Sequence, residues 1–180
     1  MATVTTISVH RLSVEDVYKM VEVGILGEYD RVELEQGVLV EMVPVGIEHE
    51  DVASWLNALF ARAASEPWQV RVQSTFLVGG GFLLPDVMLV SPRRGEAPST
   101  AHLVIEIAQS SHARDREKAG HYATADVPDY WIVDLPGRSV TVHRGPLAGA
   151  YRQVETYGDG QTVTPLLSGA PAVDVTALLG

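Results

Sequence analysis

Hydrophobic residues recur every three to four positions in three segments, and each segment predicts a helix. The first follows Ser13, an N-cap residue with acidic side chains in the turn after it. The second covers residues 48–64 and the third covers residues 115–125. Each has an apolar face that must be buried against another element, so we expect these helices to pack on a sheet.

Strands are predicted where apolar residues alternate with polar ones or form short continuous runs. The predicted strands span residues 31–42 (a hairpin that turns at Gln36-Gly37), 70–78, 86–90, 102–108, 130–134, 139–144 and 151–157. The run at 102–108 is almost entirely apolar, which is typical of a central strand covered on both faces.

The order of these elements favours a mixed α/β (α+β) fold with a central mixed sheet flanked by helices. The helix between strands 102–108 and 130–134 indicates a right-handed crossover between two parallel strands. No internal repeat divides the chain of 180 residues, so we expect one domain over residues 1–180.

The net charge and the composition limit the possible functions without deciding between them. The formal net charge is −10, which disfavours tight non-specific DNA binding, since such binding depends on Lys and Arg. It does not exclude a nuclease, because a metal site concentrates carboxylates. Cysteine is absent, and neither a signal peptide nor an apolar run of membrane-spanning length is recognisable. We therefore expect a cytoplasmic protein that does not contact a membrane.

Two carboxylates are the strongest chemical signal. Asp86 follows Pro85 at the start of a predicted strand, and Glu106 places a charge inside an apolar run. Such a charge is costly unless a cation accompanies it or the strand end exposes it. Two carboxylates on neighbouring strands can share one Mg²⁺, and the ammonium of Lys118 could stabilise a charged transition state. The plainer alternative is that the carboxylates cap or pair locally and that Lys118 is solvated.

The ordered fragments RVELEQGVLVEM, IEHED, LPDVMLV, LVIEIAQSS and RDREKAGHYATADVPDYWIVD resemble the Uma-two family of bacterial proteins. That family is assigned to the PD-(D/E)xK nuclease superfamily, with a restriction-endonuclease-like fold. The resemblance covers residues 10–145, and its most specific part is the order PD, IEI, K-x-x-x-Y and YWIVD.

The resemblance implies roles for five residues. Asp86 matches the PD aspartate and Glu106 the second acidic residue, both metal ligands, and Lys118 matches a lysine that has migrated to the following helix. Glu33 and His49 match an acidic residue and a histidine on the metal side of the site, with His49 as a metal-shell ligand or general base. The sequence departs from the family pattern at these positions: Ala108 where the superfamily pattern has lysine, Val38 in the hairpin, Ser110, and a shortened stretch before Lys118.

These roles imply a Mg²⁺- or Mn²⁺-dependent endonuclease with DNA as substrate, acting as a homodimer. Two other interpretations stay open: a catalytically inert module that associates with DNA or protein, and a hydrolase of RNA or another phosphoester. Tyr122, one turn after Lys118, either hydrogen-bonds within the site or packs in the core. Four arginines could form a basic rim for phosphates: Arg93, Arg94, Arg114 and Arg116.

Overall fold

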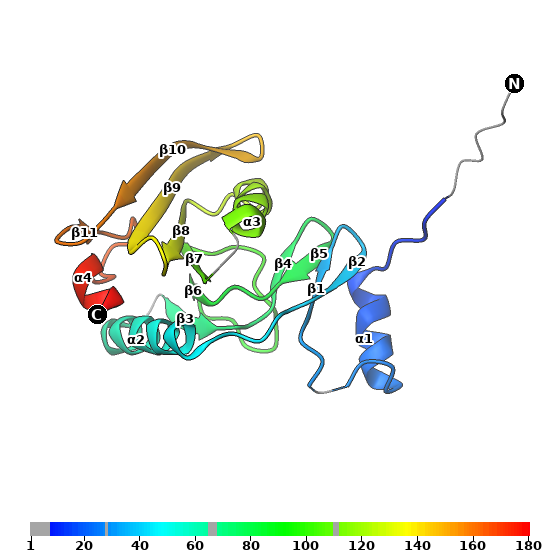
Figure 1. Ribbon diagram of the computed structural model, residues 1–180. Helices are drawn as coiled ribbons and strands as arrows, with labels where there is room; N and C mark the ends of the chain where they lie inside the picture. The colour runs from blue at the N-terminus through cyan, green and yellow to red at the C-terminus, as the bar shows by residue number, and fades with distance from the viewer. Residues whose placement is uncertain (1–7, 28, 65–67, 110–111) are drawn as a thin grey trace, which may run out of the picture.

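The computed structural model describes residues 8–27, 29–64, 68–109 and 112–180, without the side chains of residues 112–116 (Figure 1). Its helices are α1 (Val14–Glu22), α2 (Ile47–Ala63), α3 (His112–Thr124) and α4 (Val175–Leu179). Its strands are β1 (Val32–Glu35), β2 (Val38–Glu41), β3 (Gln69–Val72), β4 (Phe76–Val78), β5 (Gly81–Leu83), β6 (Val87–Val90), β7 (Leu103–Ala108), β8 (Asp129–Asp134), β9 (Ser139–Leu147), β10 (Ala150–Tyr157), β11 (Thr162–Val163) and β12 (Val173–Asp174).

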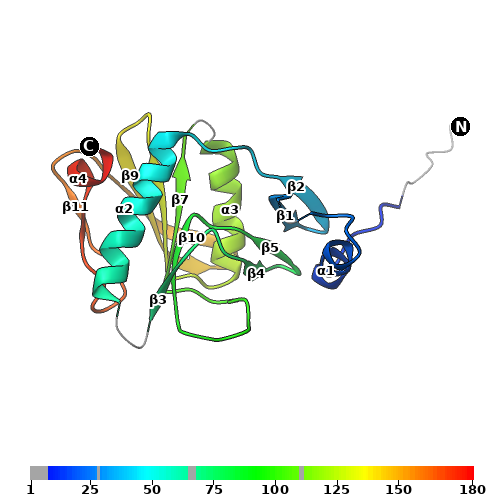
Figure 2. The ribbon, with the colours of Figure 1, turned by 90° about the horizontal axis from the view of Figure 1, so that it is seen from below.

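A six-stranded mixed sheet forms the body, in the order β10-β9-β8-β7-β6-β3. Only β7 and β8 pair in parallel among these strands, and α3 makes the crossover between them. Helices α2 and α3 lie on opposite faces of the sheet (Figure 2). Every residue of β7 is buried, as its continuous apolar run predicts. The predicted fold class, a mixed α/β fold with a central mixed sheet, is thus confirmed.

A second sheet, in the order β2-β1-β5-β4, stands beside the body together with α1 (Figure 1). Val17 of α1 packs on Leu34 and Phe82 of this sheet. Strand β5 can approach β1 because its first residue is glycine: a Cβ at Gly81 would collide with the carbonyl of Leu34. This small sheet carries Glu33 toward the body of the molecule.

The prediction of one strand over residues 70–78 is wrong. That segment divides into β3, in the main sheet, and β4, in the small sheet, and the prediction also omitted β5. The break falls at Gln73, whose φ of 44° lies in the left-handed region and ends the extended conformation. The chain therefore passes from one sheet to the other beside Asp86.

Local signals in the sequence place α1 and the β1–β2 hairpin well, whereas β11, β12 and α4 were not predicted. Helix α1 begins with a capping box, in which Ser13 Oγ accepts from the Asp16 amide at 3.2 Å and Asp16 Oδ2 accepts from the Ser13 amide at 2.9 Å. The hairpin turn at Gln36-Gly37 is confirmed, with Glu35 opposite Val38. Across the described part of the chain, no helix is long and apolar enough to cross a membrane.

Candidate active site

The five residues singled out from the sequence meet where the two sheets and two helices adjoin. Glu33 comes from β1, His49 from α2, Asp86 from the residue before β6, Glu106 from β7 and Lys118 from α3. All five residues are between 0% and 6% exposed. Ionisable groups are rarely buried to this degree without partners, so the contacts among them decide what the cluster can do.

Asp86 and Glu106 are brought together by the pairing of β6 with β7. Val87 lies opposite Ile105 in this antiparallel ladder, so the next position outward sets Asp86 opposite Glu106. Asp86 Oδ2 accepts from the Ile107 amide at 2.8 Å. This hydrogen bond fixes the carboxylate of Asp86 to the strand that carries Glu106, and the strand register sets the two residues opposite each other.

His49 holds the same oxygen of Asp86 from the other side. Its Nε2 lies 3.0 Å from Asp86 Oδ2, and an ionised carboxylate can only accept, so Nε2 donates. Burial disfavours the charged imidazole, but the hydrogen bond to Asp86 and the charges of Asp86 and Glu106 outweigh it and raise the pKa of His49. Nδ1 is buried and has no hydrogen-bond partner among the described residues. His49 is therefore a buried partner of Asp86, not an exposed helix-start histidine.

Lys118 bridges two carboxylates from different sheets. Its Nζ lies 2.9 Å from Glu33 Oε1 and 3.1 Å from Glu106 Oε1. Glu33 Oε1 also accepts from the Leu84 amide at 2.9 Å, which ties β1 to the chain entering β6. The shortened stretch before α3 thus still delivers Lys118 to the carboxylates, and the solvated-lysine alternative is wrong.

Tyr122 belongs to the same cluster, since one helical turn separates it from Lys118. Its hydroxyl donates to Glu106 Oε1 at 2.6 Å, and its ring packs 4.9 Å from Tyr130 and 5.8 Å from Phe76, measured between centroids. Tyr122 therefore hydrogen-bonds within the site and also packs in the core. Burial raises the pKa of Tyr122 well above its ordinary value, and so does the charge of Glu106, so the hydroxyl keeps its proton as a donor.

Three carboxyl groups share this cluster with the ammonium of Lys118 and the imidazole of His49. Burial raises the pKa of Glu106 to about 7; the attraction of Lys118 opposes this rise and the charge of Asp86 adds to it. Burial alone would lower the pKa of Lys118, yet the charges of Glu106 and Glu33 raise it overall. Lys118 therefore stays charged, and Glu106 loses its proton near neutral pH.

The donor set fits a hard divalent cation that keeps much of its own water. No group of three or more His, Asp or Glu side chains in metal-binding geometry occurs among the described residues. Two carboxylates suffice for Mg²⁺, which commonly retains several waters. Glu106 Oε2 takes no hydrogen bond from a described residue, and Asp86 Oδ1 has only the Gln73 amide, at 3.5 Å. These two oxygens are available to a cation.

Three residues that contact the cluster were not assigned to the site by sequence: Gln73, and Leu84 and Ile107 through their amides. Gln109 lies just outside the cluster. Gln109 Oε1 accepts from the Gly46 amide at 3.0 Å, and a Cβ at Gly46 would strike the Gln109 side chain. This contact links the end of β7 to the start of α2, the helix that carries His49. None of these residues had a signal in the sequence, because their contacts join segments far apart in the chain, whereas Tyr122 had one in its spacing from Lys118.

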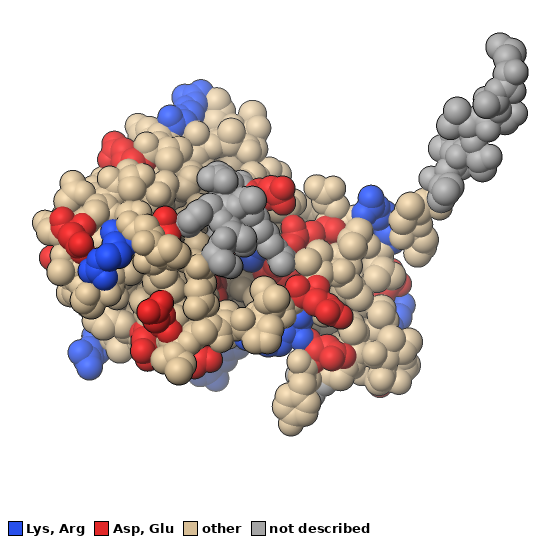
Figure 3. Space-filling model, viewed as in Figure 1, with Lys and Arg blue, Asp and Glu red and all other residues tan. Residues whose placement is uncertain are grey.

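Of the four arginines predicted to form a basic rim, Arg93 and Arg94 do not lie at this cluster. Arg93 and Arg94 follow the last residue of β6, whereas Asp86 precedes the first, so they lie at opposite ends of the strand. Arg93 pairs with Glu96 in its own loop, at 3.7 Å. The side chains of Arg114 and Arg116 lie outside the described residues. Figure 3 shows acidic side chains spread over one face of the molecule, with basic side chains scattered singly.

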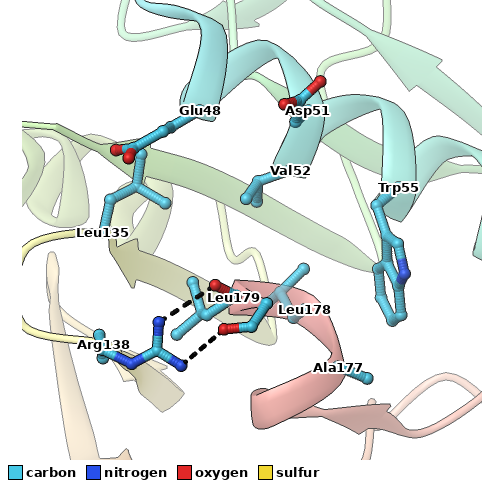
Figure 4. Close-up of a pocket in the computed structure, with 10 residues that line it drawn as sticks. Glu48, Asp51, Val52, Trp55, Leu135, Arg138, Ala177, Leu178 and Leu179 are labelled. Atoms are coloured by element: carbon cyan, nitrogen blue, oxygen red, sulfur yellow. Dashed lines mark hydrogen bonds between the residues drawn. The ribbon is translucent and has the colours of Figure 1, made fainter.

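A separate cavity of about 310 Å³ lies between α2 and α4 and is lined by none of the five residues (Figure 4). On one side of it, Arg138 donates to the carbonyls of Leu179 at 3.2 Å and Gly180 at 3.1 Å, and it pairs with Asp159 at 3.1 Å. These bonds fix the C-terminal helix to the turn before β9. The cavity is a feature of that packing and is distinct from the carboxylate cluster.

Comparison with protein-family models decides the family. The model of the Uma2 family, described as "Putative restriction endonuclease", matches residues 6–175. The chain belongs to the Uma2 family. The match extends past both ends of the resemblance at residues 10–145, so the C-terminal strands up to β12 belong to the Uma2 unit as well.

Among solved structures, this Uma2 chain is similar to one titled as a putative nuclease belonging to DUF820 from Anabaena variabilis. The TM-score is 0.76 at 15% sequence identity, over 93% of this chain and 97% of that chain. At this identity the likeness shows the fold alone. No curated protein matches the chain. The family and the fold together support a nuclease in broad terms.

Proposed function

We propose that this Uma2 protein is a Mg²⁺- or Mn²⁺-dependent endonuclease that hydrolyses phosphodiester bonds in DNA. The observation that carries the proposal is the convergence of Asp86, Glu106 and Lys118 in one buried cluster, where two carboxylate oxygens remain available to a cation. A bound divalent ion would supply an acidified water and stabilise charge on the phosphate. Family membership supports the same class of reaction.

Each residue has a proposed task. Asp86 and Glu106 would hold the ion through the two oxygens left available, Oδ1 and Oε2. Lys118 would stabilise negative charge on the phosphate or orient the attacking water, since its ammonium stays protonated. His49 would fix Asp86 through Nε2, and Glu33, proposed from the sequence as a further metal ligand, holds Lys118 in this arrangement. Glu33 and His49 thus fit best as residues that orient the catalytic groups.

A plasmid-cleavage assay tests the proposal. Supercoiled DNA is incubated with purified protein and Mn²⁺, Mg²⁺ or a chelator, and Asp86→Ala is compared with Asp51→Ala. Asp51 is an exposed carboxylate of α2, so its variant is the matched control. We expect cleavage by the wild type and Asp51→Ala with either metal, and none by Asp86→Ala or with chelator. Equal cleavage by Asp86→Ala would refute a catalytic role for the cluster.

The second candidate, an inert module associated with DNA or protein, is favoured by the net charge of −10 and the acidic face in Figure 3. Calorimetric titration with Mn²⁺ separates the two. If the wild type binds Mn²⁺ and Glu106→Ala does not, the result supports the enzyme. If the wild type binds no Mn²⁺, the result supports the inert module. Cleavage of RNA but not of DNA in the same buffers would support the same active site and identify RNA as the substrate.

We also propose that the protein acts as a homodimer, because cutting both strands of a duplex calls for two sites. Among the described residues, nine of the twelve exposed large hydrophobic side chains lie between Val9 and Ile47, in the segment that contains α1 and the β1–β2 hairpin, and we propose this segment as the contact region. Sedimentation equilibrium measures the mass directly. A monomer at micromolar concentration, with or without DNA, would contradict the homodimer.

A further inference from the structure

Gln73 holds a backbone conformation that its neighbours in sequence do not explain. Among the described residues, five non-glycine residues have φ in the left-handed region: Gln36, Gln73, Asp126, Arg138 and Ala148. Gln36, Arg138 and Ala148 each lie beside a glycine in a turn between paired strands, and Asp126 follows the end of α3. Gln73 stands between strands of two different sheets with no glycine beside it. Such a conformation costs free energy for a side chain with a Cβ.

The contacts of Gln73 all lead to Asp86. Its amide donates to the Asp86 carbonyl at 3.2 Å, which extends the pairing of β3 with β6 by one position. Its side-chain Nε2 donates to Asp86 Oδ1 at 3.5 Å. The left-handed turn thus ends β3 and directs the Gln73 amide group at the carboxylate oxygen that neither His49 nor the Ile107 amide contacts.

We propose that Gln73 is a positioning residue that orients Asp86 for divalent-cation binding. The inference rests on the metal-binding role proposed for Asp86. With Oδ2 held by His49 and the Ile107 amide, rotation of the carboxylate is restrained at Oδ1 only by Gln73. A carboxylate oxygen has two lone pairs, so Oδ1 can accept from Gln73 and bind a cation at once. Hydrogen bonds that orient ligating carboxylates commonly govern metal affinity.

The chain provides a matched pair of variants, because Gln36 has nearly the same backbone conformation as Gln73, with φ of 49° against 44°, and is exposed in the β1–β2 turn. Asparagine tolerates the left-handed region better than most residues, yet its side chain is one methylene shorter than glutamine. Gln73→Asn therefore keeps the turn and withdraws the amide from Asp86. Gln36→Asn makes the same change away from Asp86.

The experiment measures two quantities for full-length wild type, Gln73→Asn and Gln36→Asn: the Tm of the metal-free protein and the Kd for Mn²⁺ by titration calorimetry. We expect both variants to match or exceed the wild-type Tm. Gln73→Asn should weaken Mn²⁺ binding on the order of tenfold, as loss of a partner to a ligating carboxylate commonly does. Gln36→Asn should leave the Kd unchanged. A second variant, Gln73→Gly, removes the side chain without straining the turn and should weaken binding equally.

Two results would overturn the inference. One is wild-type Mn²⁺ affinity in both Gln73→Asn and Gln73→Gly. The other is a large loss of Tm in both variants of Gln73 in the metal-free protein, which would make the side chain a structural element of the turn. Failure of the proposed function has a different signature, since the wild type itself would then bind no Mn²⁺ and the inference would fall with it.

Discussion

The ammonium of Lys118, on α3, lies 3.1 Å from Glu106 Oε1, on β7, and this ion pair is almost fully buried. The superfamily pattern would place a lysine at position 108, two residues after the glutamate on the same strand, where this chain has a buried Ala108. A lysine from the following helix therefore reaches the glutamate from above the sheet. Since Glu33 shares that ammonium at 2.9 Å, one cation joins the body to the small sheet.

Replacing Lys118 by methionine should strongly destabilise the protein. Met keeps the length and apolar stem of the side chain but removes the only ammonium contacting Glu33 and Glu106 among the described residues. Breaking a buried ion pair from one side costs about 3–5 kcal/mol, because the remaining charge is left uncompensated. Urea unfolding of the metal-free protein at neutral pH measures this loss.

Lys19→Met is the control for that experiment. Lys19 forms an exposed pair with Glu15 at 2.8 Å, and such pairs contribute less than about 1 kcal/mol. A similar loss of stability in both variants would mean that the buried pair has no special weight. Acidification should also restore part of the loss in Lys118→Met, since protonated carboxyls no longer repel each other.

Metal-free protein should lose stability as the pH rises through neutrality, and Glu106 should be a main cause. Its pKa is raised from 4.5 to about 7 on folding. Between these values the folded state binds more protons than the unfolded state. The stabilisation that protonated Glu106 contributes is therefore complete below pH 4.5 and is lost as the pH passes about 7. Thermal unfolding in chelator, compared between wild type and Glu106→Gln, checks this. The wild type should lose Tm relative to Glu106→Gln with rising pH, and parallel curves would show that Glu106 does not titrate there.

Tyr122→Phe should shift metal binding to higher pH. The variant keeps the ring that packs on Phe76 and Tyr130 but removes the hydroxyl donor to Glu106, a loss of about 1–3 kcal/mol for a bond to a carboxylate. That hydroxyl lowers the pKa of Glu106, so without it the glutamate keeps its proton to higher pH. Calorimetric Mn²⁺ titrations over a range of pH should show a higher midpoint for Tyr122→Phe. An unchanged midpoint together with lower Tm would assign Tyr122 to packing alone.

The sequence contained enough information to predict the strand-borne part of the site. Asp86 stood out after Pro85 at the start of a predicted strand, and Glu106 stood out as a charge inside an apolar run. Antiparallel neighbours in register bring the two positions together. The hydrophobic pattern predicted strand 102–108 and its crossover helix, and Pro128 marked the position beyond which that helix could not continue. These features depend on local periodicity, which a single sequence records directly.

Contacts between distant segments could not be predicted in the same way. The break at Gln73 has no glycine or proline to announce it, and residues 70–78 fit one strand as well as two. His49 is flanked by two glutamates, a pattern typical of an exposed helix start, yet the packing of α2 buries its ring against Asp86. Only tertiary structure decides both cases, since the deciding partner in each is Asp86.

Arginines 93 and 94 should be dispensable for cleavage, because they lie at the end of β6 away from Asp86. The double variant Arg93→Ala, Arg94→Ala should cleave plasmid at the wild-type rate at physiological salt. A steep loss of activity that lower salt restores would instead place a phosphate-binding surface on that loop.

The most direct test of the central claim is a crystal structure of the protein soaked in Mn²⁺, with anomalous scattering used to locate the ion. We predict a strong anomalous peak between Asp86 and Glu106, at coordination distance from Asp86 Oδ1 and Glu106 Oε2, that is absent from crystals of Glu106→Gln soaked in the same way. A metal-dependent site built on this carboxylate pair would be contradicted by a peak elsewhere on the molecule, or by no peak in crystals soaked in saturating Mn²⁺.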